Sequence, residues 1–288
     1  MERKGAERVS KGDPVCLFAG SVAKRLDAHA PHLLLYDADF DPKAAFRKNL
    51  LSLNCMMPFG WMSGCVTEGL RELAESGDAE AERALGAHLD FFLDDEKGVV
   101  FNDPRSMLCE NGKFHSVEDF LPFVAITSMR PDHRAVPMFL KWAAPRMQRS
   151  AGTPANRRSL STEGCYTYAY PLMKIAIARG DPKLAQFALG EITARIDRLA
   201  GPDGGIFQRA PANGNPGLKN WGRGAAWYML GLAQTLRALG GSELKSAGLK
   251  GVEKIKRAFV GGAEYLSQFQ NPDGSWHCFV DDPATLQE

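Results

Sequence analysis

Residues 164–200 decide the fold; they read GCYTYAYPLMKIAIARGDPKLAQFALGEITARIDRLA. The second half carries one continuous apolar stripe at the spacing of an α-helix face. Its members are Leu184, Phe187, Ala188, Ile192, Ile196 and Leu199. Between the halves, Gly180 is typical of a helix C-terminus, and Asp181 is typical of the N-cap of a helix that follows at once. The stretch therefore predicts two helices joined by a tight turn, which is a helical hairpin.

The same pattern recurs along most of the chain. It predicts clear helices over Met62–Ser76, Ala79–Leu93, Ser116–Arg130, Asp132–Arg149, Gly164–Arg179, Asp181–Ala200, Arg223–Leu239 and Lys250–Phe269. Weaker patterns predict helices over Val15–Ala30 and Pro42–Cys55. Tight joints at 76–78, 130–132 and 179–181 alternate with long connectors at 94–115, 150–163 and 201–222. The repeating unit is therefore a hairpin of helices.

Repeated helical hairpins stack as an open solenoid or close into a double-layered ring. In either arrangement the first helices of the hairpins run parallel. Their N-termini and the long connectors therefore lie at the same end of the fold, which we call the mouth. A turn followed by an apolar residue also recurs at 95–99, 202–206 and 272–276. We expect residues 1–288 to form a single all-α toroid domain, with the weaker N-terminal helices in residues 1–55 and the core in residues 56–288.

The predicted mouth gathers carboxylates, a guanidinium group and aromatic rings. Its residues are Trp61, Glu118, Asp119, Glu163, Tyr166, Tyr170, Trp221, Arg223 and Trp227. Carboxylates transfer protons, Arg binds a carboxylate through two parallel hydrogen bonds, and Trp stacks on sugar rings. Arg223 and Trp227 are four residues apart and share one helix face. We therefore expect a pocket for an anionic, ring-shaped ligand, with Glu163 and Asp119 across one cavity.

Each of these residues also has a structural explanation. Ser116-Val117-Glu118-Asp119 is close to a capping box, and a carboxylate near a helix start, such as Glu163, is favoured by the helix dipole. Tyr170 and Trp227 taken alone are more often core residues than ligand contacts. Only the joint presence of these groups at one mouth favours a functional site.

Composition excludes several classes of protein. The chain has 35 Lys and Arg against 34 Asp and Glu, without the basic excess of a nucleic-acid-binding surface. No apolar run has the length of a membrane span, and none follows the charged start as in a secretory signal. We therefore expect a cytoplasmic protein that binds neither nucleic acid nor membrane. The scattered cysteines, Cys16, Cys55, Cys65, Cys109, Cys165 and Cys278, lack the close spacing of a zinc site and are expected to be free thiols.

One motif resembles a known family. Asn220-Trp221-Gly222-Arg223-Gly224-Ala225-Ala226-Trp227 is similar to the W-x-R-G-x-x-W signature of the unsaturated uronyl hydrolases, glycoside hydrolase families 88 and 105 of the six-hairpin glycosidase superfamily. Four other segments follow the family's order: residues 59–70 with Trp61, Val117-Glu118-Asp119, Glu163-Gly164-Cys165-Tyr166, and Asp273-Gly274-Ser275-Trp276. The similarity covers residues 55–288. It implies an (α/α)6 barrel of six hairpins.

The resemblance also implies a reaction. Family members hydrate the C4=C5 double bond that lyases leave on a terminal uronate, with no metal or organic cofactor. It implies that Glu163 is the acid/base and Asp119 the second carboxylate. Trp61, Tyr166, Trp221, Arg223 and Trp227 would bind the substrate, together with Arg209, which stands where the family usually has His. Glu163 stands where the family has Asp.

The predicted helices make five hairpins, one fewer than the closed ring, so we expect a toroid that is incomplete at its C-terminal end and flanked by an apolar gap. The oligosaccharide and its linkage stay open, as does self-association. Two alternatives also stay open: a hydrolase of saturated sugars on the same barrel, and a catalytically weakened homologue that only binds carbohydrate.

Overall fold

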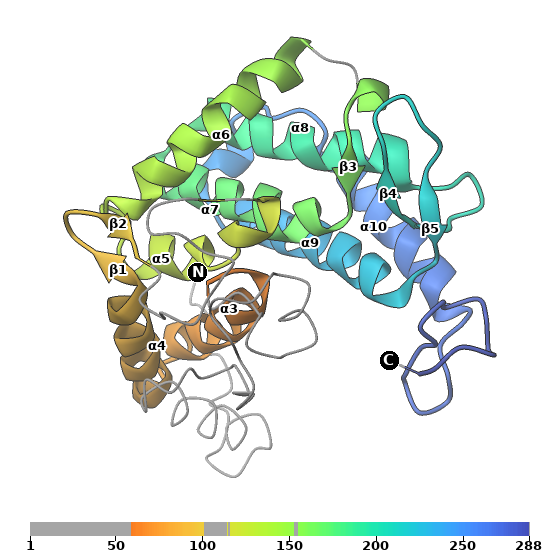
Figure 1. The fold of residues 1–288 in the computed structure, drawn as a ribbon, viewed down its shortest axis with the longest axis horizontal. Helices are drawn as coiled ribbons and strands as arrows, with labels where there is room; N and C mark the ends of the chain where they lie inside the picture. Colours follow the sequence, from red (N-terminus) through yellow and green to blue (C-terminus); the bar gives the residue numbers. More distant parts are fainter. Residues whose placement is uncertain (1–58, 101–113, 115, 153–154, 288) are drawn as a thin grey trace, which may run out of the picture. The chain divides into compact units, whose positions relative to one another are not determined.

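The computed structural model describes residues 59–100, 114, 116–152 and 155–287. These residues fall into two compact units, one ending at Phe139 and the other beginning at Leu140. Helices dominate both units (Figure 1). None of the helices in the described part of the chain has the length and apolar composition needed to cross a membrane.

The first unit is built on a helical hairpin. Its elements are α3 (Trp61–Glu75), α4 (Ala79–Phe92), β1 (Leu93–Asp94), β2 (Gly98–Val99), the 3₁₀ helix η2 (Val117–Phe120), α5 (Phe123–Met129) and the start of α6 (Ala135–Gly152). Between α3 and α4, Gly77 has a left-handed backbone with φ of 99°. Asp78 then caps α4 by accepting hydrogen bonds from the amides of Glu80 and Ala81, both at 3.0 Å. The tight joint predicted at 76–78 is therefore confirmed.

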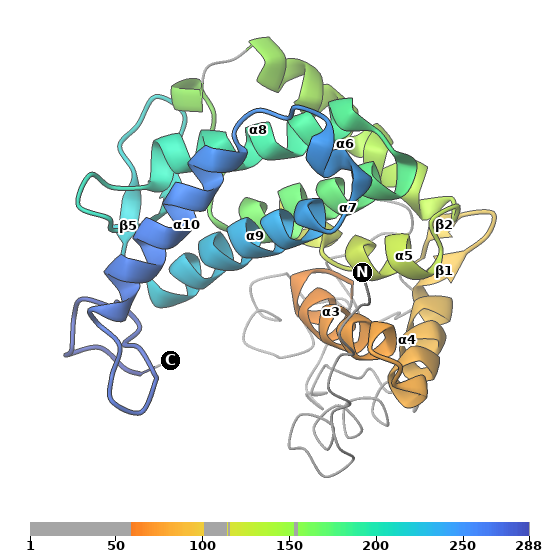
Figure 2. The same ribbon diagram turned by 180° about the vertical axis from the view of Figure 1, so that it is seen from behind.

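The second unit contains the rest of α6 and two further helical pairs. Its other elements are η3 (Ala155–Arg157), β3 (Leu160–Ser161), the π-helix η4 (Cys165–Ala169), α7 (Tyr170–Arg179), α8 (Pro182–Leu199), β4 (Phe207–Ala210), β5 (Gly217–Lys219), α9 (Gly222–Gly240), η5 (Glu243–Ser246) and α10 (Val252–Ser267). Gly180 is left-handed, and Asp181 caps α8 through the amides of Lys183 and Leu184. From behind, α10 lies across α8 and α9 (Figure 2).

Two predicted helices are broken by proline. The segment predicted as one helix over Ser116–Arg130 is η2 followed by α5, with Pro122 at the start of α5. Proline has no amide hydrogen and cannot continue the ladder of helical hydrogen bonds. The segment over Gly164–Arg179 begins as η4 and becomes α-helical at Tyr170, beside Pro171. The other clear helices are confirmed, with ends that shift by up to three residues; those predicted over Val15–Ala30 and Pro42–Cys55 lie outside the described residues.

Short strands occupy the long connectors, where the sequence predicted only loops. β1 and β2 form an antiparallel hairpin, and β3, β4 and β5 form an antiparallel sheet with β4 in the centre. In that sheet Ser161 pairs with Arg209, and Arg209 pairs with Gly217. Strands of two to four residues are too short to show the alternation of apolar and polar residues on which a sequence prediction depends. This sheet leads into the beginning of α9, where the predicted site residues lie (Figure 1).

Candidate active site

Glu163 lies in the short link between β3 and η4, and its backbone is held from both sides. The amide of Thr162 donates to the carbonyl of Gln208 at 2.9 Å, and the amide of Cys165 donates to the carbonyl of Thr162 at 2.9 Å. The carbonyl of Glu163 itself accepts a hydrogen bond from the Thr167 hydroxyl at 2.9 Å. The carboxylate is therefore carried on a restrained backbone rather than on a free loop.

The two carboxylate oxygens of Glu163 have different surroundings. Oε1 accepts a hydrogen bond from Nε2 of Gln208 at 2.7 Å. Oε2 is buried, and no group in the described residues forms a hydrogen bond with it. A buried acceptor without a partner is costly, and such groups occur where a ligand, a water molecule or a proton completes the site. One oxygen thus positions the side chain, and the other has a hydrogen-bonding capacity that no described residue fills.

Gln208 is a site residue that the sequence did not predict. Adjacent residues of a strand point to opposite faces of the sheet. Gln208 faces Glu163, so its neighbour Arg209 lies on the other face of β4, where it is exposed. The predicted role of Arg209 in binding stays a prediction, but the contact with Glu163 comes from Gln208. The signal that could have found it is its place in the sequence, directly before the predicted residue Arg209.

Three aromatic rings lie in a continuous stack near this carboxylate. The rings of Tyr166 and Tyr170 are nearly parallel, at 3°, with centroids 5.7 Å apart. Tyr166 also stacks on Trp227, with centroids 6.0 Å apart and an angle of 23°. All three side chains are buried. This stack joins the beginning of η4 to the first two turns of α9.

Trp221 and Arg223 stand at the start of α9. Trp221 is the N-cap residue, and the Arg223 guanidinium lies over its ring, with Cζ 4.5 Å from the centroid. The next residue, Gly224, lies against Gln208: a Cβ placed on this glycine would be 3.2 Å from Gln208 Cβ. Gln208 therefore touches both Glu163 and the first turn of α9. The second unit thus links Glu163 to the first turn of α9 through Gln208, and Tyr166 to Trp227 through their stacked rings. The catalytic and binding roles of these residues stay predictions.

Asn220 anchors the start of α9 to the C-terminal segment. It is buried and has a left-handed backbone, with φ of 61°. Its Nδ2 donates to the Tyr265 hydroxyl at 2.8 Å and to Asp281 Oδ2 at 2.7 Å, while its Oδ1 accepts from the amide of Ile206 at 3.1 Å. Since asparagine tolerates this conformation better than most residues, these contacts explain why it precedes the Trp221–Trp227 motif.

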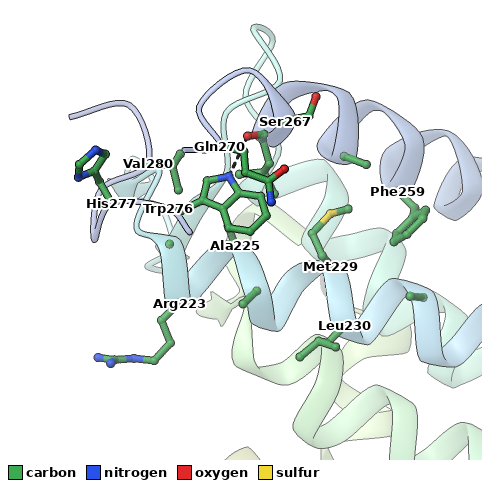
Figure 3. A pocket seen from close by; sticks show the side chains of 15 residues that line it. Arg223, Ala225, Met229, Leu230, Phe259, Ser267, Gln270, Trp276, His277 and Val280 are labelled. Atoms are coloured by element: carbon green, nitrogen blue, oxygen red, sulfur yellow. Dashed lines mark hydrogen bonds between the residues drawn. The ribbon is translucent and has the colours of Figure 1, made fainter. Parts of the chain in front are cut away.

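An apolar groove of about 780 Å³ lies between α9, α10 and the C-terminal segment, and none of the three stacked rings lines it. Figure 3 shows Trp276, Met229 and Phe259 along it, while the guanidinium end of Arg223 points away from them. Its lining is mostly apolar, and its few polar side chains include Arg223, Ser267, Gln270 and His277. We therefore do not assign it to the candidate active site.

The remaining predicted residues lie in the first unit. Asp119 is buried, and its Oδ2 accepts a hydrogen bond from the Ser116 amide at 3.1 Å, while the Ser116 hydroxyl accepts from the Glu118 amide at 3.1 Å. These bonds form the capping box that the sequence offered as the structural explanation of Asp119. Trp61 is the first residue of α3. The predicted approach of Asp119 to Glu163 stays a prediction.

Nucleophilic and metal chemistry receive no support from the described residues. Burial raises the pKa of the Cys165 thiol to about 12, so this group stays protonated near neutral pH. Cys65, Cys165 and Cys278 are free thiols, as predicted for them. The described residues contain no group of three His, Cys, Asp or Glu side chains that could hold a metal ion. The candidate site is thus a carboxylate beside aromatic rings and a guanidinium group.

The chain is similar to one known protein family. Residues 58–288 match a family described as Glycosyl Hydrolase Family 88. No curated protein matches the sequence.

Solved structures of several bacterial proteins resemble this chain. One is a possible member of family GH105 from Salmonella enterica subsp. enterica serovar Paratyphi A str. ATCC 9150, at 16% identity and a TM-score of 0.65, with 99% of this chain and 74% of that one covered. A family 105 glycoside hydrolase from C. acetobutylicum ATCC 824 is 12% identical, with a TM-score of 0.61 over 82% of this chain and 69% of that one. The unsaturated glucuronyl hydrolase of Bacillus sp. GL1, described as responsible for glycosaminoglycan degradation, is 17% identical, with a TM-score of 0.55 over 94% and 71% of the two chains. At these identities the likeness concerns the fold, and it confirms the predicted all-α fold of the (α/α) toroid class.

Proposed function

The chain belongs to glycosyl hydrolase family 88, and on that basis we propose that it releases sugars from unsaturated uronyl oligosaccharides by adding water to the C4=C5 double bond of the terminal uronate. The observation that carries the proposal is the state of Glu163. Its Oε1 is held by Gln208, and its buried Oε2 has no hydrogen-bond partner in the described residues. A carboxyl group placed in this way is suited to proton transfer with a bound ligand.

In the proposed reaction Glu163 acts as general acid and then as general base. Its proton passes to C4 of the uronate, and the carboxylate then takes a proton from the water that adds at C5. The product is a hemiketal, which opens to a ketone; the acetal carbon C1 becomes a hemiacetal and expels the attached sugar. One water molecule is consumed, and no oxidant, reductant or cofactor takes part.

The surrounding groups are proposed to bind the uronate. Arg223 is exposed and its guanidinium lies over the Trp221 ring, and in the proposed complex it binds the substrate carboxylate through two parallel hydrogen bonds. The edge of the stack of Tyr166 and Trp227 supplies an apolar surface for the sugar ring. Asp119 as the second carboxylate, and Trp61 and Arg209 as further binding residues, complete the proposal by the order of the family's motifs.

The test is a panel of unsaturated disaccharides derived from pectin, ulvan and glycosaminoglycans. Loss of the ultraviolet absorbance of the double bond, together with release of the second sugar, is the expected result for at least one of them. Release of sugar from a saturated uronide instead would support a hydrolase of the ordinary kind. Binding without turnover on every probe would point to a carbohydrate-binding homologue.

A further inference from the structure

The clearest unassigned feature of the second unit is a buried group of three ionised side chains beneath Glu163. Arg195 of α8 is 3% exposed, and its Nη1 donates to Glu191 Oε2 at 2.9 Å. Arg158 donates to the other oxygen of the same carboxylate. Glu191 is itself 3% exposed. Ionised groups are costly to bury, and removal of one partner leaves the others uncompensated, so such a group needs a structural or functional reason.

The charges in this group support one another. Burial on its own would raise the pKa of Glu191, but the Arg195 and Arg158 guanidinium groups outweigh this effect and lower it. Burial would likewise lower the pKa of Arg195, but the Glu191 carboxylate raises it. Glu191 and Arg195 therefore stay charged across the neutral range, and their ion pair holds Arg195 in a fixed orientation.

The rest of the Arg195 guanidinium group contacts the segment that carries Glu163. Its Nε donates to the carbonyl of Ser161 at 2.9 Å, two residues before Glu163. On the other side, the guanidinium packs on the Cα of Gly164: a Cβ built there would lie 2.1 Å from Nη2 and 2.6 Å from Cζ. The residue after Glu163 must therefore be glycine as long as Arg195 keeps its place. One planar group thus touches the chain on both sides of the carboxylate.

We infer that Arg195, held by Glu191 and Arg158, is a positioning residue that sets the backbone of Glu163 and so aims its Oε2 at the substrate. The inference rests on the proposed function for its catalytic consequence. Arg195 is buried, and its hydrogen bonds are to Ser161 and Glu191, so we assign it no contact with the substrate. Its loss should therefore alter turnover rather than substrate affinity.

The decisive variants are Arg195→Lys, Gly164→Ala and the two combined. Lysine keeps the charge but cannot bond Ser161 and Glu191 while covering Gly164, because it lacks the planar fork. Each single change should lower kcat by about 10- to 100-fold with KM within about threefold of wild type, since a misplacement near 1 Å costs about that much. In the Arg195→Lys background, Gly164→Ala should cost little more, because the guanidinium that the new methyl group would strike is gone.

Arg198→Lys is the matched control. Arg198 lies one turn later on α8 and also donates to backbone carbonyl groups, those of Pro211 and Gly214, but these belong to the loop between β4 and β5. It should leave kcat close to wild type. Independent, multiplicative effects of Arg195→Lys and Gly164→Ala, or wild-type kcat in either single variant, would overturn the inference. If Arg195→Lys does not fold, Gly164→Ala decides alone, because it keeps Arg195.

A second readout does not depend on activity. Cys165 is fully buried two residues after Glu163, so its rate of modification by a thiol reagent, followed by peptide mass spectrometry, reports opening of this segment. We expect faster modification in Arg195→Lys and a wild-type rate in Arg198→Lys. If the wild type turns over no unsaturated uronide, the proposed function fails, and the Cys165 rate still tests the positioning role: equal rates in both variants would contradict it.

Discussion

At the scale of single residues, the proposed chemistry depends on one proton of Glu163. Gln208 donates to Oε1 at 2.7 Å and would also donate to the carbonyl oxygen of an amide side chain. Glu163→Gln thus removes the proton and preserves the shape. In the proposed site, Gln208 would fix the longer side chain of a glutamate where the family has aspartate.

We predict that Glu163→Gln lowers kcat by about 10²- to 10⁴-fold, the usual contribution of a general acid–base group, while ligand binding stays close to wild type. The measurements are steady-state kinetics and calorimetric titration with an unsaturated disaccharide. Glu264→Gln, at an exposed position on α10, is the control. Equal losses of affinity and turnover would assign Glu163 to binding instead.

Arg223 should distinguish sugars that end in a uronate from neutral sugars. A guanidinium forms a planar, forked contact with a carboxylate and stacks on an aromatic face, and an ammonium group reproduces neither. We therefore predict that Arg223→Lys weakens binding of uronate-ended sugars by about tenfold or more and hardly changes binding of neutral ones, as measured by titration of matched sugars. Arg237→Lys at the other end of α9 is the control. The same loss for both kinds of sugar would mean that Arg223 only braces the helix start.

At the scale of elements, the tight joints between paired helices stabilise the helical hairpins. Asp181 accepts hydrogen bonds from the amides of Lys183 and Leu184 at 2.9 and 3.0 Å, which satisfies two donors at the start of α8. We predict that Asp181→Ala lowers the free energy of unfolding by about 1 kcal/mol, whereas Asp181→Asn, which keeps the acceptor, has a much smaller effect. Urea unfolding of both variants measures the difference. Equal destabilisation would show that charge, rather than the cap, is what matters at this position.

The repeated turn in the connectors, like the helix caps, is formed by residues that are close in sequence. Gly98, Gly204 and Gly274 are all left-handed, with φ of 86°, 92° and 90°. Asp203 and Asp273 directly precede their glycines and accept hydrogen bonds from the amides of Gly205 and Ser275, whereas Asp94, four residues before Gly98, accepts from the amides of Glu96 and Lys97. The second and third turns of the internal repeat thus share one geometry, and the first shares with them the left-handed glycine and an Asp side chain that accepts from the backbone.

At the scale of the whole molecule, the apolar groove of the second unit leaves hydrophobic side chains exposed. Leu230, on its wall, is 41% exposed. We predict that a fluorescent apolar dye binds the protein and that Leu230→Glu reduces this fluorescence. Leu286→Glu, at a leucine that is 85% exposed and does not line the groove, should leave it unchanged. Equal fluorescence in both variants and wild type would mean that the groove is not the dye site.

The sequence by itself determined the helices, their tight joints, the recurring turn and the family. Helix caps, left-handed glycines and apolar stripes depend on residues that are close in sequence, so they can be predicted from the sequence alone. The short strands, the π-helix and the break at Pro122 were missed, because their patterns are shorter than a helical stripe or depend on the neighbouring strand. The tertiary structure alone decided the details of the site: Gln208 lies 45 positions from Glu163, and Arg195 lies 34 positions from Ser161. Such contacts exist only when packing brings distant segments together, since neither residue's type nor its local spacing specifies its partner.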